Sequence, residues 1–307
     1  MIKAVILGCG NIAGGYDINS RPEDFYSHIK AYQSNSQVHV TAVYDPSPGV
    51  AQLFSQYWSI PRFYNDLSLM LTEERPEVAS ICSPNSYHCE QIEQCVSAGV
   101  HTILCEKPIS YDIEIARGTI ELCRSKNVSL VINYLRNWDQ AFLELENILK
   151  QDEYPEFIQV HYSKGVFHNA SHFINFFQRS LGDCTRVSVI RTEKEGLDAL
   201  SDFELGFEKC ARVLFVNHKA TYKPITELDI YFPSQRIRVE NGGQIFRYES
   251  YMTGEKWSKD GTIHTCMKEV INDVVEQALN RTPNPAWEKN LADTLKTTII
   301  CSKIVQN

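Results

Sequence analysis

A short apolar segment followed directly by glycines constrains this chain more than any other feature. Residues Lys3–Leu7 are typical of a β-strand, and the next six residues match the pattern G-x-G-x-x-G/A. In that pattern the first glycine forms a tight turn, the second lets the backbone approach a pyrophosphate, and the small last residue packs a helix on the strand. Backbone N–H groups at the helix start then bind the anion. The sequence predicts a dinucleotide site on Gly8, Cys9, Gly10, Asn11 and Ile12, with Ala13 as the small residue.

The first 135 residues alternate between short β-branched runs and helical patterns. The expected strands are Lys3–Leu7, Val38–Tyr44, Val78–Cys82, His101–Cys105 and Val128–Ile132. Between them, apolar residues recur three or four positions apart, which is the spacing of a helix with one buried face. Strands that alternate with helices form βαβ units, and these place the strands in a parallel sheet. We therefore expect residues 1–135 to form a dinucleotide-binding Rossmann domain with a doubly wound α/β sheet.

After about residue 150 the pattern changes to short strands that lie close together. In Gln235–Glu240, charged residues alternate with Ile237 and Val239, as in a strand with one face in water. The other expected strands are Phe157–Tyr162, Thr185–Ile190, Ala211–Val216, Glu227–Phe232 and Gln244–Tyr248. Two helical patterns close the chain. We expect residues 136–307 to form an α+β domain with a mostly antiparallel open sheet, whose C-terminal helices could pack back on the first domain.

Composition and charge exclude several classes of protein. The chain has 307 residues, enough for two domains, and its formal net charge of −8 without a run of Lys or Arg argues against a nucleic-acid partner. No stretch approaches the roughly 18 consecutive apolar residues of a membrane helix, and the first apolar run is too short for a signal peptide. The ten cysteines form no Cys-x-x-Cys pair. We expect reduced thiols in a cytoplasmic protein with no membrane partner.

An acidic residue, Asp45, follows the second expected strand. A carboxylate there would bind the ribose hydroxyls of the adenosine half and repel a 2′-phosphate. No Lys or Arg follows within ten residues to bind that phosphate, so NAD is predicted in preference to NADP. The usual interval from the glycines is about 20 residues, and an inserted segment around Tyr16–Phe25 would explain the longer one here. The alternative is that Asp45 only caps the next helix.

A lysine lies just after another expected strand. His101–Cys105 leads into Glu106-Lys107-Pro108, and ligands of open parallel sheets bind at the carboxyl ends of the strands. Lys107 would therefore project where a nicotinamide binds, although Glu-Lys alone is a common surface dipeptide. Two further segments accompany it, Ile81-Cys82-Ser83-Pro84-Asn85-Ser86-Tyr87-His88 and Ala98-Gly99-Val100-His101.

Together with the glycine-rich turn, these segments strongly resemble the glucose–fructose oxidoreductase/inositol dehydrogenase (Gfo/Idh/MocA) family of NAD(P)-dependent oxidoreductases. The resemblance continues through Asn133–Asp139 and covers residues 1–140 better than the remainder. It implies hydride transfer between nicotinamide and a carbinol or keto carbon of a sugar, polyol or sugar nucleotide. It also implies that the second domain binds this substrate and packs its open sheet on a partner subunit, as in a homodimer or homotetramer.

The resemblance implies roles for individual residues. Lys107 would contact the substrate hydroxyl and the nicotinamide, and Glu106 would position the nicotinamide ribose or Lys107 itself. A lysine desolvated in a closed cleft can assist proton transfer because its pKa is lowered toward neutrality. Tyr134 and Arg136 are the expected substrate contacts at the domain junction. Ser83, Pro84, Asn85 and His88 would line the middle and the nicotinamide-ribose end of the cofactor.

The second domain departs from the family pattern at one position. The family carries Asp-x-x-x-His, and the best match here runs from His168 to His172. His172 takes the place of the histidine that exchanges the substrate hydroxyl proton, and His168 replaces the aspartate. Both are expected to contact substrate and to take part in catalysis. A structural histidine on an aromatic helix is the alternative for His172. Because fold and motif do not establish catalysis, a non-catalytic NAD(P)-sensing regulatory protein is the alternative for the chain.

The same two histidines are four positions apart, as in the zinc-binding pattern H-E-x-x-H. Position 169 is Asn where that pattern has its Glu, and no third ligand is evident nearby in the sequence. No metal is therefore expected.

Overall fold

The computed structural model describes residues 1–219, 224–282 and 284–306, and the chain divides into two compact units. The first unit contains residues 1–133 and 264–292, and the second contains residues 134–263 and 293–307. Helix α8 (Cys266–Asn280) belongs to the first unit, although it lies within the range 136–307 predicted for the second domain. The reason is its apolar face, which packs on α1 (His28–Gln33), β1 (Ile2–Leu7) and β5 (Thr102–Cys105). Helix α9 (Pro285–Gln306) begins in the first unit and ends in the second.

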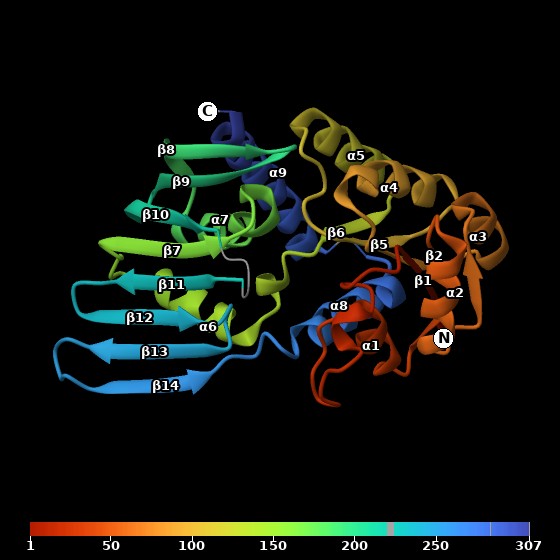
Figure 1. The fold of residues 1–307 in the computed structure, drawn as a ribbon, viewed down its shortest axis with the longest axis horizontal. Helices are drawn as coiled ribbons and strands as arrows, with labels where there is room; N and C mark the ends of the chain where they lie inside the picture. Colours follow the sequence, from red (N-terminus) through yellow and green to blue (C-terminus); the bar gives the residue numbers. More distant parts are fainter. Residues whose placement is uncertain (220–223, 283, 307) are drawn as a thin grey trace. The chain divides into compact units, whose positions relative to one another are not determined.

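The first unit is built on six parallel strands in the order β3-β2-β1-β4-β5-β6 (Figure 1). Besides β1 and β5, these are β2 (Val38–Tyr44), β3 (Arg62–Tyr64), β4 (Val78–Ile81) and β6 (Ser129–Ile132). Every residue of β4 and β5 is buried, as expected for a parallel sheet covered on both faces. The predicted Rossmann sheet is confirmed. Strand β3 was not predicted because it has three residues, two of them exposed, and therefore shows no apolar run.

Helices α2 (Pro48–Tyr57), α3 (Leu67–Glu74), α4 (His88–Ser97) and α5 (Ile113–Ser125) connect these strands, together with the short turns η1 (Gly15–Asp17) and η2 (Asn85–Tyr87). Local chemistry fixes their starts. The Asp66 carboxylate accepts the N–H of Leu69 at 3.0 Å, and the Asp112 carboxylate accepts the N–H of Glu114 at 2.8 Å. Such caps satisfy N–H groups that have no partner within the helix.

The second unit contains an eight-stranded sheet in the order β14-β13-β12-β11-β7-β10-β9-β8. Its strands are β7 (Phe157–Ser163), β8 (Cys184–Glu195), β9 (Asp198–Phe207), β10 (Cys210–His218), β11 (Thr226–Tyr231), β12 (Gln235–Glu240), β13 (Ile245–Ser250) and β14 (Lys256–Asp260). Neighbouring strands pair antiparallel except β7 and β10, which are parallel. The prediction of a mostly antiparallel sheet is confirmed, although β9 and β14 were not predicted.

Helices cover one face of this sheet. Phe142 of α6 (Gln140–Leu149) packs on Phe246 of β13, and Phe177 of α7 (Ser171–Leu181) packs on Phe215 of β10. Two further turns belong to this unit, η3 (Leu135–Asn137) and the π-helical turn η4 (Val166–Ala170). Aromatic rings therefore help to form the core of the second unit.

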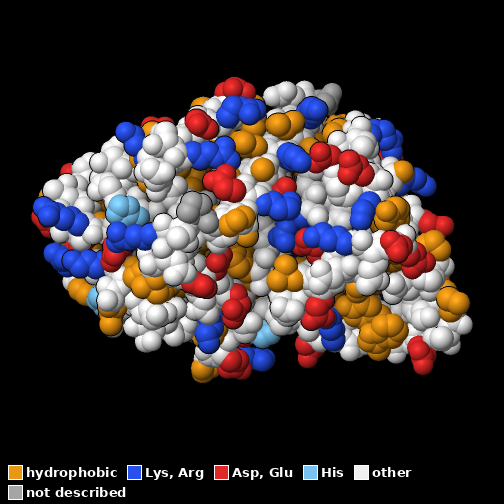
Figure 2. All heavy atoms as spheres, turned by 180° about the vertical axis from the view of Figure 1, so that it is seen from behind, with side chains coloured by type: hydrophobic (Ala, Val, Ile, Leu, Met, Phe, Trp, Pro, Cys, Tyr) orange, Lys and Arg blue, Asp and Glu red, His pale blue; other side chains and the backbone are white. Residues whose placement is uncertain are grey.

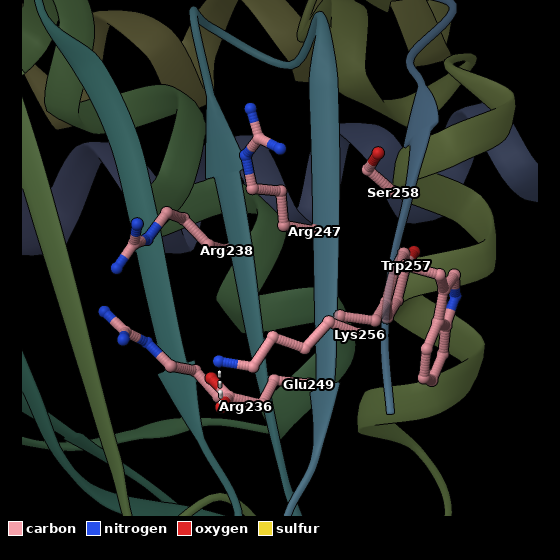
Figure 3. Close-up of a pocket in the computed structure, with 8 residues that line it drawn as sticks. Arg236, Arg238, Arg247, Glu249, Lys256, Trp257 and Ser258 are labelled. Carbon is pink, nitrogen blue, oxygen red and sulfur yellow. Dashed lines mark ion pairs between the residues drawn. The ribbon is translucent and has the colours of Figure 1, made fainter. Parts of the chain in front are cut away.

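The opposite face of the sheet carries charged side chains that pair across strands. Asp229 of β11 binds Arg236 and Arg238 of β12, and Glu240 of β12 binds Arg247 of β13. Lys256 of β14 and Glu249 of β13 form an ion pair of 2.7 Å, and the three arginines surround the same hollow of about 390 Å³ (Figure 3). Because each of these four cations has an acidic neighbour, this part of the open face is polar without being a basic surface.

Charge is also mixed elsewhere on the surface. Figure 2 shows Lys and Arg side chains interspersed with Asp and Glu over the face that it draws. Within the described parts of the chain, no helix has the length and apolar character needed to cross a lipid bilayer.

Candidate active site

The glycine-rich turn has the shape that a dinucleotide requires. Gly8 has a φ of +90°, and a Cβ there would lie 2.7 Å from the backbone nitrogen of Ser83, so no side chain fits. A Cβ at Gly10 would meet nothing within 4 Å, so the backbone at Gly10 borders open space. Ala13 is fully buried. A tight turn, an accessible backbone and a small packed residue together fit a pyrophosphate at this turn.

The helix after the glycines is interrupted by an inserted segment. In a continuous helix the Ile12 carbonyl would accept the N–H of residue 16, but it accepts that of His28 at 3.0 Å, and the Ala13 carbonyl accepts that of Ile29 at 2.9 Å. The helical course therefore resumes in α1 twelve residues late. This agrees with the predicted insertion and explains why Asp45 lies 35 residues beyond Gly10.

A buried carboxylate closes the inserted segment. Asp17, 6% exposed, accepts the N–H of Tyr26 at 3.0 Å and both the N–H and the hydroxyl of Ser27, at 2.7 and 2.6 Å. The segment also bonds to the rest of the first unit, because the N–H of Phe25 donates to the carbonyl of His264 at 2.7 Å. The insertion is thus an ordered loop and not a loose connection.

Asp45 lies beside the glycine-rich turn. Its Oδ2 accepts the N–H of Cys9 at 3.1 Å, and its Oδ1 accepts the N–H of Ser47 at 3.0 Å. Two N–H donors therefore fix a negative charge between the turn and α2. Burial, reinforced by the Asp45 charge, raises the pKa of Cys9 to about 12, so this thiol stays protonated near neutral pH.

Glu106 and Lys107 follow β5 at the carboxyl edge of the sheet. The Oε1 of buried Glu106 accepts the Nδ2–H of Asn133 at 2.6 Å and contacts the Nε2 of His28 at 3.0 Å. Burial raises the pKa of Glu106, but the hydrogen bonds and charges of His28, Asn133 and Lys107 outweigh it, and the pKa is lowered. Glu106 is therefore an ionised carboxylate beside half-buried Lys107.

The segment after β4 is held by a histidine. His88 is 1% exposed, and its Nδ1 and Nε2 lie 2.8 Å from the Pro108 carbonyl and 2.9 Å from the Ser83 carbonyl. Burial lowers the pKa of His88 despite these two acceptors. His88 thus bridges the backbones of the two segments predicted to line the cofactor, while Pro84 is exposed and Asn85 half-buried at the edge.

In the second unit, the residues after Asn133 are packed inward. Tyr134 is 1% exposed and makes an edge contact with the His172 ring, with centroids 5.9 Å apart. The guanidinium of Arg136 lies 5.1 Å from the Phe142 ring centroid and 4.7 Å from that of Phe173, and donates to the Gly242 carbonyl at 3.3 Å. Tyr134 and Arg136 were predicted from the sequence to contact substrate. Their packing against neighbouring rings is sufficient to account for both residues.

The two histidines of the second unit lie in different environments. His168 is exposed in η4, whereas His172 is half-buried in the first turn of α7. A carboxylate from β9 fixes the start of η4, because the N–H groups of Phe167 and His168 donate to Oδ1 and Oδ2 of Asp198, each at 3.0 Å. A Cβ at Gly165 would overlap the same carboxylate. His168 replaces the aspartate of the family pattern, but an acidic residue from another strand, Asp198, binds the backbone of the same turn.

Three residues that organise this candidate site were not predicted from the sequence to do so. His28 and Asp198 carry no local motif, and only the fold brings them to Glu106 and to η4. Asn133 lies in a segment that was recognised, but its contact with Glu106 was not predicted. Within the described residues, no group of three or more His, Cys, Asp or Glu side chains could hold a metal ion.

Comparison with known proteins identifies the relatives of this chain. Residues 2–134 match the Gfo/Idh/MocA family, described as an oxidoreductase family with an NAD-binding Rossmann fold. D-glucoside 3-dehydrogenase of Escherichia coli is 26% identical over 133 residues, which are 43% of this chain and 34% of that protein. Inositol 2-dehydrogenase of Salmonella typhimurium is 27% identical over 173 residues, 55% of this chain and 47% of the other. The matches thus span about a third to a half of these relatives.

Solved structures resemble the whole chain. An oxidoreductase from Agrobacterium radiobacter, in complex with NAD⁺, L-tartaric acid and magnesium, has a TM-score of 0.78 at 14% identity and covers 100% of this chain and 96% of its own. A 3-ketoreductase variant from Actinomadura kijaniata, in complex with TDP-benzene and NADP, has a TM-score of 0.81 at 13% identity, covering 99% and 97%. At these identities the likeness shows the fold of both units.

Proposed function

Because residues 2–134 match the Gfo/Idh/MocA family of oxidoreductases, we propose that this chain transfers a hydride between a nicotinamide cofactor and a carbinol or keto carbon of a sugar, polyol or sugar nucleotide. One observation carries the proposal: the open backbone at Gly10 and the Glu106–Lys107 pair lie at the same carboxyl edge of one parallel sheet. That edge is where ligands of open α/β sheets bind. A sensor of the cofactor would need the first of these features but not the second.

Residues of the first unit would hold the cofactor. The backbone of Gly8, Cys9, Gly10, Asn11 and Ile12 would bind the diphosphate, and Ser83, Pro84 and Asn85 would line its middle. Asp45 supports NAD over NADP, because a carboxylate fixed by two N–H donors repels a 2′-phosphate. His88 would serve the cofactor indirectly by holding the backbones of Ser83 and Pro108. The bound nicotinamide would supply the hydride acceptor or donor.

Proton transfer is assigned to His172. Oxidation of an alcohol requires a group that accepts the hydroxyl proton, and an imidazole is suited to this near neutral pH. Lys107 would polarise the substrate oxygen, with His168 as an exposed contact near the substrate. The proposal requires Lys107 and His172 to reach the same substrate oxygen. Tyr134 would orient the His172 ring, and Arg136 would stabilise the packing of the second unit.

The open face of the second sheet is the surface proposed for self-association into a homodimer or homotetramer. Its charges are already paired within one chain, so a second copy would meet a polar surface. Sedimentation velocity of the purified protein decides this part of the proposal, because a monomer at micromolar concentration would contradict it.

A turnover screen tests the function. The purified chain is mixed with NADH and cyclic keto-sugars, and separately with NAD⁺ and aldoses, inositols and nucleotide-linked sugars, while NADH absorbance is followed. We expect turnover with at least one member and a higher kcat/KM with NAD(H) than with NADP(H). Tight NADH binding without turnover across the panel would favour the regulatory alternative instead.

A further inference from the structure

A histidine that the proposed chemistry does not use lies at the centre of the first unit. His28 is fully buried at the first position of α1, immediately after the inserted segment. Burial of an ionisable ring is unfavourable unless its polar atoms are bonded. The ring uses Nε2 for the contact with Glu106 at 3.0 Å, while Nδ1 has no hydrogen-bond partner among the described residues. The Glu106 contact is therefore the polar contact that accounts for a histidine at this position.

The tautomer of His28 follows from its partner. An ionised carboxylate only accepts hydrogen bonds, so the Nε2 of His28 carries the hydrogen that points to Oε1. Asn133 donates to the same oxygen at 2.6 Å. Two directional bonds to one oxygen restrict the rotation of the carboxyl group, and bonds to a charged acceptor are stronger than neutral ones. Glu106 is thus fixed from α1 on one side and from the end of β6 on the other.

His28 is also bonded to the glycine-rich turn. Its backbone N–H donates to the Ile12 carbonyl at 3.0 Å, and the next N–H donates to the Ala13 carbonyl at 2.9 Å. The same residue therefore connects the cofactor turn, through its backbone, with the Glu106–Lys107 segment, through its ring. The inserted segment leaves this connection intact, because the helical course resumes at His28.

We propose that His28 is a positioning residue that holds the Glu106 carboxylate beside Lys107 and ties it to the glycine-rich turn. The inference rests on the proposed oxidoreductase function, since it is Lys107 that would use the orientation. His28 itself has no assigned contact with substrate. Its effect passes through Glu106, whose fixed negative charge favours the ammonium form of the neighbouring lysine.

The charged and titratable groups around Glu106 set the expected pH dependence. They are His28 on α1, Lys107 beside it, His88 on α4, Cys82 after β4 and Cys105 on β5. Burial alone raises the pKa of Glu106, and His28 is the first group that opposes this effect. Without the His28 donor, the pKa of Glu106 rises and the carboxylate is lost at a higher pH than in the native protein.

Two amide substitutions provide a matched test. In His28→Gln the side-chain N–H₂ can reach the position of Nε2, whereas in His28→Asn it reaches only that of Nδ1. We expect His28→Asn to lose kcat by roughly 10- to 100-fold, the cost of one bond to a charged group, and to shift the acid limb of its kcat/KM profile to higher pH. His28→Gln should recover most of both. Ile29→Val, a buried change on the same helix, controls for packing and should leave the profile in place.

A second readout needs no substrate. The rate at which an amine-reactive reagent labels Lys107 at fixed pH is measured by peptide mass spectrometry, with NADH affinity measured in parallel. We expect faster labelling in His28→Asn than in His28→Gln or Ile29→Val, because a carboxylate that is no longer held beside Lys107 stabilises its ammonium form less. Equal labelling in the Asn and Gln variants would overturn the role of His28. Absence of turnover in the native chain would overturn the proposed function and leave the labelling result to decide on His28.

Discussion

The carboxyl edge of the first unit and the start of α7 in the second unit are held by different forces. At the first, side chains from α1 and from the end of β6 converge on one buried carboxylate, Glu106. At the second, His172 lies against the Tyr134 ring, and a carboxylate from β9 accepts backbone N–H groups of η4. One region is organised by side-chain charge and the other by aromatic packing and a backbone cap.

This difference predicts how each region responds to change. A network centred on an ionised carboxylate depends on pH and tolerates only substitutions that keep a donor. A region stabilised by packed aromatic rings depends on how well the side chains fit. Substitutions there should lower the free energy of unfolding before they change a pH profile. The two regions should therefore be separable by experiment.

The largest effect is expected at Lys107 in the charged region. Lys107→Ala removes the group that would polarise the substrate oxygen, and kcat should fall by about 10²- to 10⁴-fold. The affinity for NADH, measured by fluorescence titration, should change little because the diphosphate binds the glycine-rich turn. If NADH affinity falls as steeply as kcat, Lys107 belongs to the cofactor site and not to the reaction.

In the second region, Asp198→Asn should mainly cost stability. It replaces a charged acceptor of two N–H groups at the start of η4, and the free energy of unfolding in urea should fall by roughly 1–3 kcal/mol. Glu193→Gln, which breaks an exposed pair with Lys219, is the matched control and should leave the urea midpoint in place. An unchanged midpoint in Asp198→Asn as well would show that this carboxylate does not support η4.

A smaller loss of stability is expected when Arg136 is replaced, and this substitution distinguishes a packing role from a substrate contact. Arg136→Met keeps the side-chain volume between Phe142 and Phe173 but removes the cation, so unfolding should become easier by about 1–2 kcal/mol. The KM for substrate should stay within about twofold. A raised KM with unchanged stability would contradict the packing role and support the substrate contact predicted from the sequence.

The smallest effect is expected in the acid dependence of stability. The pKa of Glu106 is lower in the folded chain than the usual value of about 4.3. Its contribution is therefore present above that value and is lost as the pH falls through the lower folded pKa. Glu106→Gln should reduce the decrease in stability between about pH 5 and pH 3, as followed by urea unfolding. A decrease equal to that of the native chain would show that Glu106 is not held in its charged form.

The sequence predicted more of the first unit than of the second, for a physical reason. In the first, ligand-binding residues follow successive parallel strands, so the position of a residue after its strand already places it at the shared edge. Gly8, Asp45 and Lys107 could be located in this way. The insertion was also visible, because Asp45 lies too far from the glycines.

What could not be predicted depends on contacts between distant residues. The link from His28 to Glu106 spans 78 positions, and the one from Asp198 to His168 spans 30. Tyr134 and Arg136 occupy a recognised segment, yet only the fold reveals the rings packed against them. The parallel pairing of β7 with β10 also follows from the fold, since the sequence pattern of a strand does not indicate its direction.

A crystal structure of the chain with NAD⁺ bound would show whether the cofactor brings the assigned residues together. We expect the diphosphate on the N–H groups of the glycine-rich turn, the adenosine ribose on Asp45, and the nicotinamide C4 beside Lys107 with the His172 ring facing it. A dinucleotide bound away from Lys107, or a His172 ring that packs away from the nicotinamide, would contradict the assigned chemistry and leave cofactor sensing as the better explanation.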